Sequence, residues 1–102
     1  MIFRSLSEKE KDSALELAWN VFLEFEAPDY SREGVDEFAK TIRDPGFIGK
    51  LTIYGAFEGE DLLGVLATRS GGDHIALFFV KAKRQGQGIG RRLFDLAVKE
   101  NG

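Results

Sequence analysis

The stretch VKAKRQGQGIGRRLF, running from Val80 to Phe94, decides the fold of this chain. It follows the apolar run HIALFFV (His74 to Val80), contains glycines at positions 86, 88 and 90, and ends in residues with helical periodicity. Five positive charges surround the glycines: Lys81, Lys83, Arg84, Arg91 and Arg92. An apolar run followed by a glycine-rich turn and a helical pattern indicates a strand, a tight loop and a helix start in succession.

The glycine-rich turn has the chemistry of an anion site. The first N–H groups of a helix have no acceptor within the helix, and glycines admit a ligand to these groups and permit the positive φ angles of a tight loop. Arg91 and Arg92 fall in the first helical turn, where cations oppose the helix dipole at a cost of about 0.3 to 1 kcal/mol each. Because a bound phosphate would reverse that sign, we predict a phosphate ligand at this loop.

The first half of the chain is predicted to be mainly helical. A short strand at residues 1–4 precedes a helix at about 7–25, which begins with the capping-box pair Ser7 and Glu10. Apolar residues recur on one face of this helix at steps of three and four. A second helix is capped by Ser31 and stops at Asp44-Pro45-Gly46.

The second half is predicted to contain three strands and a last helix. The strands lie at 51–57, 62–69 and 74–80, with polar turns at 58–61 and 70–73. Because residues 74–80 are apolar at nearly every position, they predict a central strand covered on both faces. The last helix stops at Asn101-Gly102, and its apolar stripe consists of Ile89, Leu93, Leu96 and Ala97.

The element order β-α-α-β-β-β-α predicts an α/β (α+β) fold, with a mixed, mostly antiparallel sheet flanked by helices. A length of 102 residues suits one domain spanning residues 1–102, which should bury roughly 60 to 70% of the surface of the unfolded chain. No cysteine is present, which excludes disulfides and thiolate chemistry and agrees with a reducing compartment. No apolar run approaches the roughly 20 residues of a membrane span, and no signal peptide is visible, so we expect a cytoplasmic protein.

The charge distribution is uneven. Residues 1–80 carry 8 Lys and Arg against 15 Asp and Glu, a net charge of −7, whereas residues 81–102 carry 6 against 2, a net charge of +4. A general nucleic-acid binder would show a basic face over much of the domain. We therefore expect no nucleic-acid partner, although binding of the basic segment 81–92 to nucleic acid is kept as a hypothesis that a steep salt dependence would support.

The spacing of the glycines shows which of the known phosphate-binding motifs the loop can match. The P-loop and G-x-G-x-x-G patterns both fail here. Residues 85–90, QGQGIG, match Q-x-x-G-x-G instead. This motif resembles the pyrophosphate-binding loop R/Q-x-x-G-x-G/A of the GNAT superfamily of N-acetyltransferases, and the family's order of elements resembles that of nearly the whole chain.

The resemblance implies a donor and a site for it. The donor is acetyl-CoA, whose pyrophosphate is held by amides from Gln85 to Arg91, while the pantetheine arm pairs like an extra strand with the backbone near Phe79 and Val80. Lys83, Arg84, Arg91 and Arg92 are candidates for phosphate contacts or for plain surface charges. The cofactor-binding residues implied are Phe79, Val80, Gln85, Gly86, Gln87, Gly88, Ile89, Gly90 and Arg91.

The resemblance also implies direct attack of a primary amine on the thioester, with a base to deprotonate the amine and an acid for the thiolate. His74 stands where some family members place a base, although a histidine that caps a turn is the alternative. Glu24 and Glu26 adjoin the loop that shapes the acceptor pocket in the family and are otherwise surface charges. Neither Tyr30 nor Tyr54 matches the position of the family's tyrosine acid, and no metal site is expected.

The chain is shorter than a typical member, which continues beyond this helix with further strands and a helix. We therefore expect the domain to be incomplete at its C-terminus, with an open sheet edge that invites homodimerisation or strand exchange. The predicted function is acetyl-CoA-dependent N-acetylation of a small-molecule or peptide amine. The alternative is an inactive acyl-CoA-binding or protein-interaction module of the same fold. The sequence does not identify the acceptor.

Overall fold

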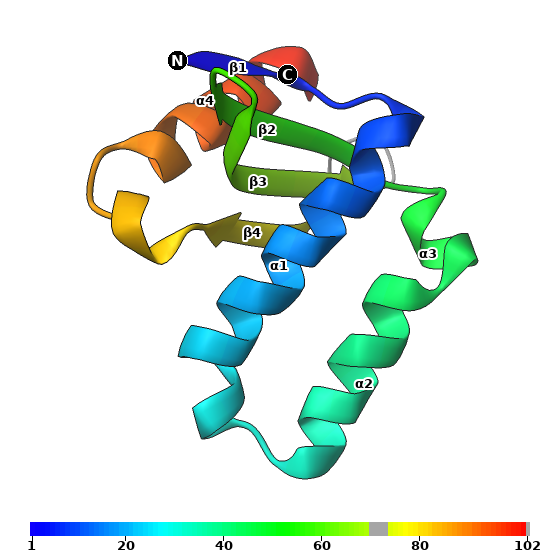
Figure 1. Ribbon diagram of the computed structural model, residues 1–102. Coiled ribbons are helices and arrows are strands. Elements are labelled where there is room, and N and C mark those ends of the chain that lie inside the picture. Colours follow the sequence, from blue (N-terminus) through cyan, green and yellow to red (C-terminus); the bar gives the residue numbers. More distant parts are fainter. Residues whose placement is uncertain (70–73, 102) are drawn as a thin grey trace.

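The computed structural model describes residues 1–69 and 74–101 (Figure 1). The turn predicted at 70–73 and the stop at Gly102 lie outside the described residues. Three-residue 3-10 helices lie at Glu8–Glu10, Ala27–Asp29 and Ala82–Arg84. The main elements in chain order are β1 (Ile2–Ser5), α1 (Lys11–Phe25), α2 (Arg32–Arg43), α3 (Pro45–Ile48), β2 (Thr52–Glu58), β3 (Asp61–Arg69), β4 (His74–Val80) and α4 (Ile89–Asn101).

This order confirms the predicted succession, with the one-turn helix α3 added. Ser31 accepts a hydrogen bond from the Gly34 N–H at 3.1 Å and caps α2, as predicted. The sequence Asp44-Pro45-Gly46 ends α2 and also begins α3, because the Asp44 carboxylate accepts from the Gly46 N–H at 3.0 Å. The sequence therefore placed the break correctly but missed the helical turn after it.

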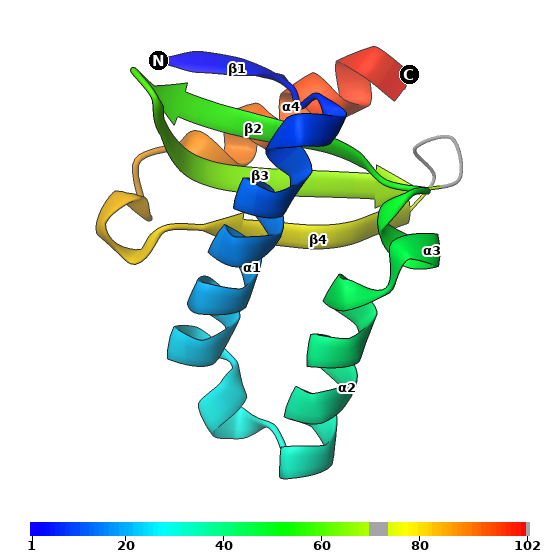
Figure 2. The same cartoon turned by 45° about the vertical axis from the view of Figure 1, so that its right-hand side comes forward.

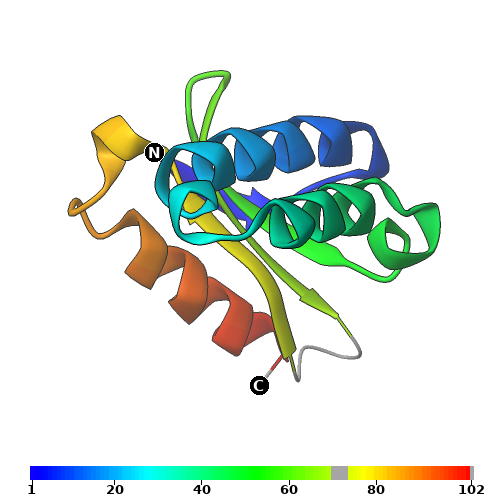
Figure 3. The ribbon, with the colours of Figure 1, turned by 90° about the horizontal axis from the view of Figure 1, so that it is seen from below.

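The four strands form one sheet in the order β1-β2-β3-β4, and every pairing is antiparallel (Figure 2). Tyr54 of β2 lies opposite Leu66 of β3, which lies opposite Phe78 of β4. Helices α1 and α2 cover one face of the sheet, and α4 covers the other (Figure 3). An antiparallel sheet between two layers of helices is the α+β fold that the sequence predicts.

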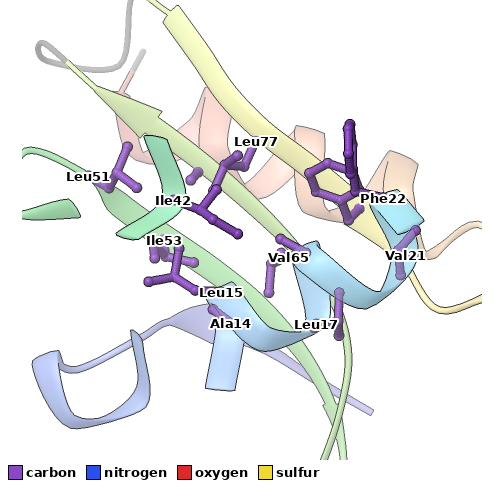
Figure 4. Close-up of a cluster of buried hydrophobic side chains, with 13 residues drawn as sticks. Ala14, Leu15, Leu17, Val21, Phe22, Ile42, Leu51, Ile53, Val65 and Leu77 are labelled. Atoms are coloured by element: carbon purple, nitrogen blue, oxygen red, sulfur yellow. The ribbon is translucent and has the colours of Figure 1, made fainter. Parts of the chain in front are cut away.

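Each face of the sheet has its own core. The larger core joins α1 and α2 to the sheet, and Figure 4 shows Phe22 of α1 and Ile42 of α2 over Val65 and Leu77. The smaller core lies beneath α4, where Ile89 and Leu93 are almost fully buried. Its buried residues are Tyr54, Ala56, Leu63, Leu66, Ile89, Leu93 and Ala97. Strand alternation sends successive residues to opposite faces, so one sheet supports both cores.

The prediction that residues 74–80 form a central strand is wrong. Strand β4 is the last strand of the described sheet, and β2 and β3 are its interior strands. Residues 64–68 of β3 are all buried, whereas Ile75 and Phe78 of β4 are 40% and 42% exposed. Leu77 and Phe79 of β4 are buried in the larger core and Val80 packs against the smaller one, and an apolar run does not reveal how many strands flank it.

None of the helices in residues 1–69 and 74–101 combines the length and apolar character needed to cross a bilayer. The cytoplasmic location remains a prediction.

The start of the first helical segment is tied to β1 by an ion pair. Arg4 donates two hydrogen bonds to the Glu10 carboxylate, at 2.9 and 2.7 Å, and the Ser7 N–H donates to Glu10 Oε1 at 2.9 Å. The Glu10 side chain thus makes its half of the predicted capping box. The segment begins as a 3-10 turn at Glu8–Glu10 before α1. The bond from Arg4, then that from Ser7, lowers the pKa of Glu10 from 4.5 to about 2.

We predict that Glu10 makes part of the stability of the fold dependent on pH. A carboxyl with a lowered pKa stabilises the folded state fully above its unfolded pKa, near 4.5, and loses this contribution as the pH falls towards 2. Glu10→Gln should therefore unfold at lower urea concentration than the wild type at pH 6, and the difference should shrink towards pH 2. Glu24→Gln, an exposed substitution in α1, is the control. A Glu10→Gln deficit that is equal at pH 6 and pH 2 would contradict the assignment.

Candidate functional site

The glycine-rich loop connects the end of β4 to the start of α4. Gly86 and Gly88 have φ angles of 78° and 82°, a region that other residues enter only at a cost. Gly90 has no such angle, but a Cβ there would lie 3.3 Å from Cζ of Phe78. Two of the glycines therefore serve the shape of the loop, and the third serves the close approach of α4 to β4.

The start of α4 presents backbone donors at this loop. The Arg92 N–H donates to the Gly88 carbonyl at 3.1 Å, which is the first bond of the helix. The amides of Ile89, Gly90 and Arg91 precede that bond, so they have no acceptor within the helix. The Ile89 side chain is 2% exposed and fixes the first turn against the sheet. The position of these donors is therefore set by the smaller core.

A pocket of about 440 Å³ opens at these donors. It brings together the end of β4, the loop and the first turn of α4. The lining residues are Phe78, Val80, Arg84, Gln85, Gly86, Gly88, Ile89, Gly90 and Arg91. Seven of the nine residues that the sequence predicts for the cofactor are among them. Phe79 and Gln87 are not, and Phe78 and Arg84 are additions to the predicted set.

The placement of Phe78 follows from the pairing of β4. The Lys81 N–H donates to the Leu63 carbonyl at 2.8 Å, so Lys81 and Phe79 direct their backbone groups to β3. Phe78 and Val80 direct theirs to the open side of the strand. Gln85 Nε2 donates to the Val80 carbonyl at 3.0 Å on that side. The backbone groups of successive residues in a strand point alternately to its two sides. Had the sequence shown that β4 lies at the edge of the sheet, this alternation would have predicted Phe78 instead of Phe79 as a cofactor-binding residue.

All three arginines near the loop have partners in the protein. Arg84 makes two hydrogen bonds of 3.0 Å to the Glu58 carboxylate and one of 2.9 Å to Gln87. The bonds from Arg84 hold the pKa of Glu58 below its ordinary value. The Arg92 guanidinium lies 4.1 Å from the centre of the Phe3 ring. Arg91 contacts Asp95 at 3.3 Å and remains 80% exposed.

A second pocket, of about 390 Å³, lies on the other side of the β4 edge. Helix α1, α2, the turn between them and β4 form its walls. The lining residues are Phe22, Glu26, Tyr30, Phe38, Ile75, Ala76, Leu77, Phe78 and Phe79. Glu26 is part of it, whereas Glu24 is exposed and not among its lining residues. The two pockets meet at Phe78.

The structure does not bring His74 to either of these pockets. It is exposed and pairs with Arg69 at the far end of β4, six residues and about 20 Å along the strand from Val80. Tyr54 is buried in the smaller core, and Tyr30 lines the second pocket. Sequence spacing alone gave no reason to select Tyr30. In the described part of the chain, no group of three or more His, Asp or Glu side chains is arranged to hold a metal ion.

Comparisons with known proteins identify a family. The acetyltransferase (GNAT) domain profile matches residues 26–101. No curated protein sequence matches the chain.

Solved structures share the fold. A GCN5-related N-acetyltransferase from Rhodopseudomonas palustris superposes with a TM-score of 0.80 and 19% identity, over 99% of this chain and 65% of that one. The PaiA N-acetyltransferase from Thermoplasma acidophilum, in complex with coenzyme A, gives 0.76 and 20%, over 97% and 70%. An aminoglycoside 6'-N-acetyltransferase complexed with coenzyme A gives 0.58 and 20%, over 98% and 54%. This chain thus spans between about half and 70% of the length of these three proteins.

We predict that the Glu58 carboxylate keeps the loop in place through Arg84. In Glu58→Gln the charge that holds Arg84 is lost, so amide hydrogens at residues 82–91 should exchange several-fold faster, because local opening becomes more frequent. Mass spectrometry of the exchanged peptides measures this. Glu60→Gln changes the same hairpin turn without touching Arg84 and should leave the exchange unaltered. Equal exchange in the two variants would show that the ion pair does not order the loop.

Proposed function

This chain belongs to the GNAT family of acetyltransferases, and on that premise we propose that it transfers the acetyl group of acetyl-CoA to a primary amine. The observation that supports this most directly is the 440 Å³ pocket, where left-handed glycines, helix-start amides that have no acceptor within the helix and the outer edge of a strand converge. Each of these features suits a different part of the proposed donor.

The pyrophosphate is proposed to lie against the loop and the first turn of α4. The amides of Ile89, Gly90 and Arg91 supply hydrogen bonds, and the helix dipole favours negative charge there. A Cβ at Gly86 or Gly88 would meet no neighbouring atom within 4 Å, so the space beside these glycines is open to a ligand. Arg91 lines the pocket and is exposed enough to turn towards a phosphate.

The pantetheine arm is proposed to lie along the open side of β4. The outward backbone groups of Phe78 and Val80 offer donors and acceptors at the spacing of a neighbouring strand. Gln85 Nε2 already engages the Val80 carbonyl from that side, so the arm is proposed to pair with the Phe78 groups and with the remaining lone pair of that carbonyl. An arm bound in this way carries its thioester from the loop towards the middle of β4.

The chemistry proposed is direct transfer. The amine nitrogen attacks the thioester carbonyl carbon, an N–C bond forms, and the C–S bond breaks with its electron pair leaving on sulfur. The amine loses one proton to a base, and the thiolate gains one. The register between β3 and β4 shifts at Ala67/Thr68 and leaves Ala76 without a partner residue. A backbone N–H released at such an irregularity would stabilise the oxyanion.

We predict that a large side chain at position 88 abolishes donor binding. Gly88→Trp and Gly59→Trp both place a side chain at a left-handed position with open space around it, with φ angles of 82° and 61°. Both should lose roughly 1 to 2 kcal/mol of stability from backbone strain. Only Gly88→Trp fills the pocket, so calorimetry should detect acetyl-CoA binding in the wild type and in Gly59→Trp but not in Gly88→Trp.

Absence of acetyl-CoA binding to the folded wild-type protein would overturn the proposal. Binding without acetyl transfer to any amine of a broad panel would favour the alternative function, an acyl-CoA-binding module without activity. Transfer is measured by the release of free coenzyme A thiol.

A further inference from the structure

We propose that the second pocket takes an acceptor whose single amine is attached to an aromatic or similarly flat apolar body. This inference rests on the proposed function, since it assigns the acceptor for the same reaction. The pocket volume of about 390 Å³ falls within the range of small-molecule sites. Its walls come from both layers of the structure, the helices α1 and α2 and the strand β4.

The walls of the pocket are largely aromatic. Phe22 and Phe38 stack with ring centres 4.0 Å apart, Tyr30 meets Phe22 edge-on at 5.0 Å, and Phe79 meets Phe38 at 6.0 Å. Phe22 and Phe79 are 1% and 9% exposed, so they form a fixed floor, while Tyr30 is 50% exposed and forms the rim. Aromatic rings pair with other rings in such stacked and edge-on geometries, and each pair adds about 0.5 to 1.5 kcal/mol beyond burial. The surface therefore suits a flat apolar group.

The single negative charge of the pocket determines which polar group the acceptor can carry. Glu26 is the one charged residue in the described lining, and no Lys or Arg accompanies it. A single carboxylate attracts a single ammonium group. A second ammonium would enter apolar walls without a carboxylate partner, and an acceptor carboxylate would face the like charge of Glu26; both are unfavourable. The pocket thus disfavours polyamines, aminoglycosides and amino acids.

The position of the pocket suits the transfer. Phe78 belongs to both pockets, so an amine in the aromatic pocket and a thioester on the open side of β4 approach each other at this residue. Glu26 is placed to accept the proton that the amine loses, directly or through a water, and the departing thiolate takes a proton from solvent. The apolar walls oppose the charged form of the amine and the Glu26 carboxylate favours it, so the neutral amine that attacks forms as its proton moves to Glu26.

The test compares four amines at equal concentration with acetyl-CoA: 2-phenylethylamine, spermidine, kanamycin and phenylalanine. We expect kcat/KM for 2-phenylethylamine to exceed that of each of the other amines by about tenfold or more. A tenfold difference is the size of effect expected from one aromatic ring pair or one hydrogen bond to a charged group. Calorimetry with 2-phenylethylamine alone measures binding to the pocket independently of the donor. Calorimetry with acetyl-CoA measures the donor site.

Matched variants test whether the preference for 2-phenylethylamine arises in this pocket. Glu26→Gln should weaken 2-phenylethylamine binding about tenfold and lower the rate of transfer, with acetyl-CoA affinity unchanged. Glu24→Gln, two residues away on the exposed surface, should change neither. Tyr30→Ala removes the rim and should weaken binding of 2-phenylethylamine more than that of ethylamine, which has no ring to stack.

The outcomes separate the two proposals. If acetyl-CoA binds but spermidine, kanamycin or phenylalanine is preferred, or if Glu26→Gln behaves like Glu24→Gln, the acceptor assignment is wrong and the proposed function stands. If acetyl-CoA does not bind, the proposed function fails, and binding of 2-phenylethylamine alone still decides whether the pocket takes such an amine. A dimer in sedimentation that 2-phenylethylamine does not dissociate and that Phe78→Asp disrupts would show that a second copy covers the pocket, which also overturns the assignment.

Discussion

The backbone of β4 is hydrogen-bonded to β3 on one side, and in the described residues no strand pairs with its other side, where Gln85 bonds to the Val80 carbonyl. Both pockets depend on this asymmetry. One lies where the strand ends and the glycine-rich loop turns away, and the other lies between the strand and the helices α1 and α2. If β4 were central, as its apolar sequence suggests, a neighbouring strand would occupy the groups of Phe78 and Val80, and there would be no backbone edge for a ligand to pair with.

The unpaired side of β4 can bind a ligand because the loop and the helix beside it are held in fixed positions. Gly64 lets Val80 and Ile89 approach β3 closely, since a Cβ there would lie 3.2 to 3.4 Å from their methyl carbons. Gly90 does the same for α4 and Phe78. The bonds between Arg84 and Glu58 connect the loop to the β2–β3 hairpin. The helix amides and the strand edge therefore keep a constant geometry, so a ligand that spans both pays little for ordering the protein.

Signals between neighbouring residues were enough to predict most of the helices and strands. The features that the sequence did not predict depend on contacts between residues far apart in the chain. The cap at Ser31, the break at Asp44 and the glycine-rich loop before α4 are signals within a few residues, and they placed the bounds of α2 and the start of α4 correctly in the chain. The order of strands depends on pairing between residues such as Leu66 and Phe78, which no local pattern encodes. For the same reason the sequence could not separate Glu26, which faces the aromatic pocket, from Glu24, nor select Tyr30, since the fold alone brings α1, the following turn and β4 together.

The positive charges near the loop need different explanations. Arg92 lies in the first turn of α4, where the dipole costs it about 0.3 to 1 kcal/mol, but its contact with the Phe3 ring at 4.1 Å contributes about 0.5 to 1 kcal/mol. Arg92 is thus accounted for without a ligand, as is Arg84 by Glu58. Among the described residues, the ion pair of Arg91 is an exposed contact to Asp95, in the less favourable order for a helix, and such a pair contributes a few tenths of a kcal/mol. The dipole argument for a bound anion therefore rests on Arg91, the arginine of that turn that also lines the pocket.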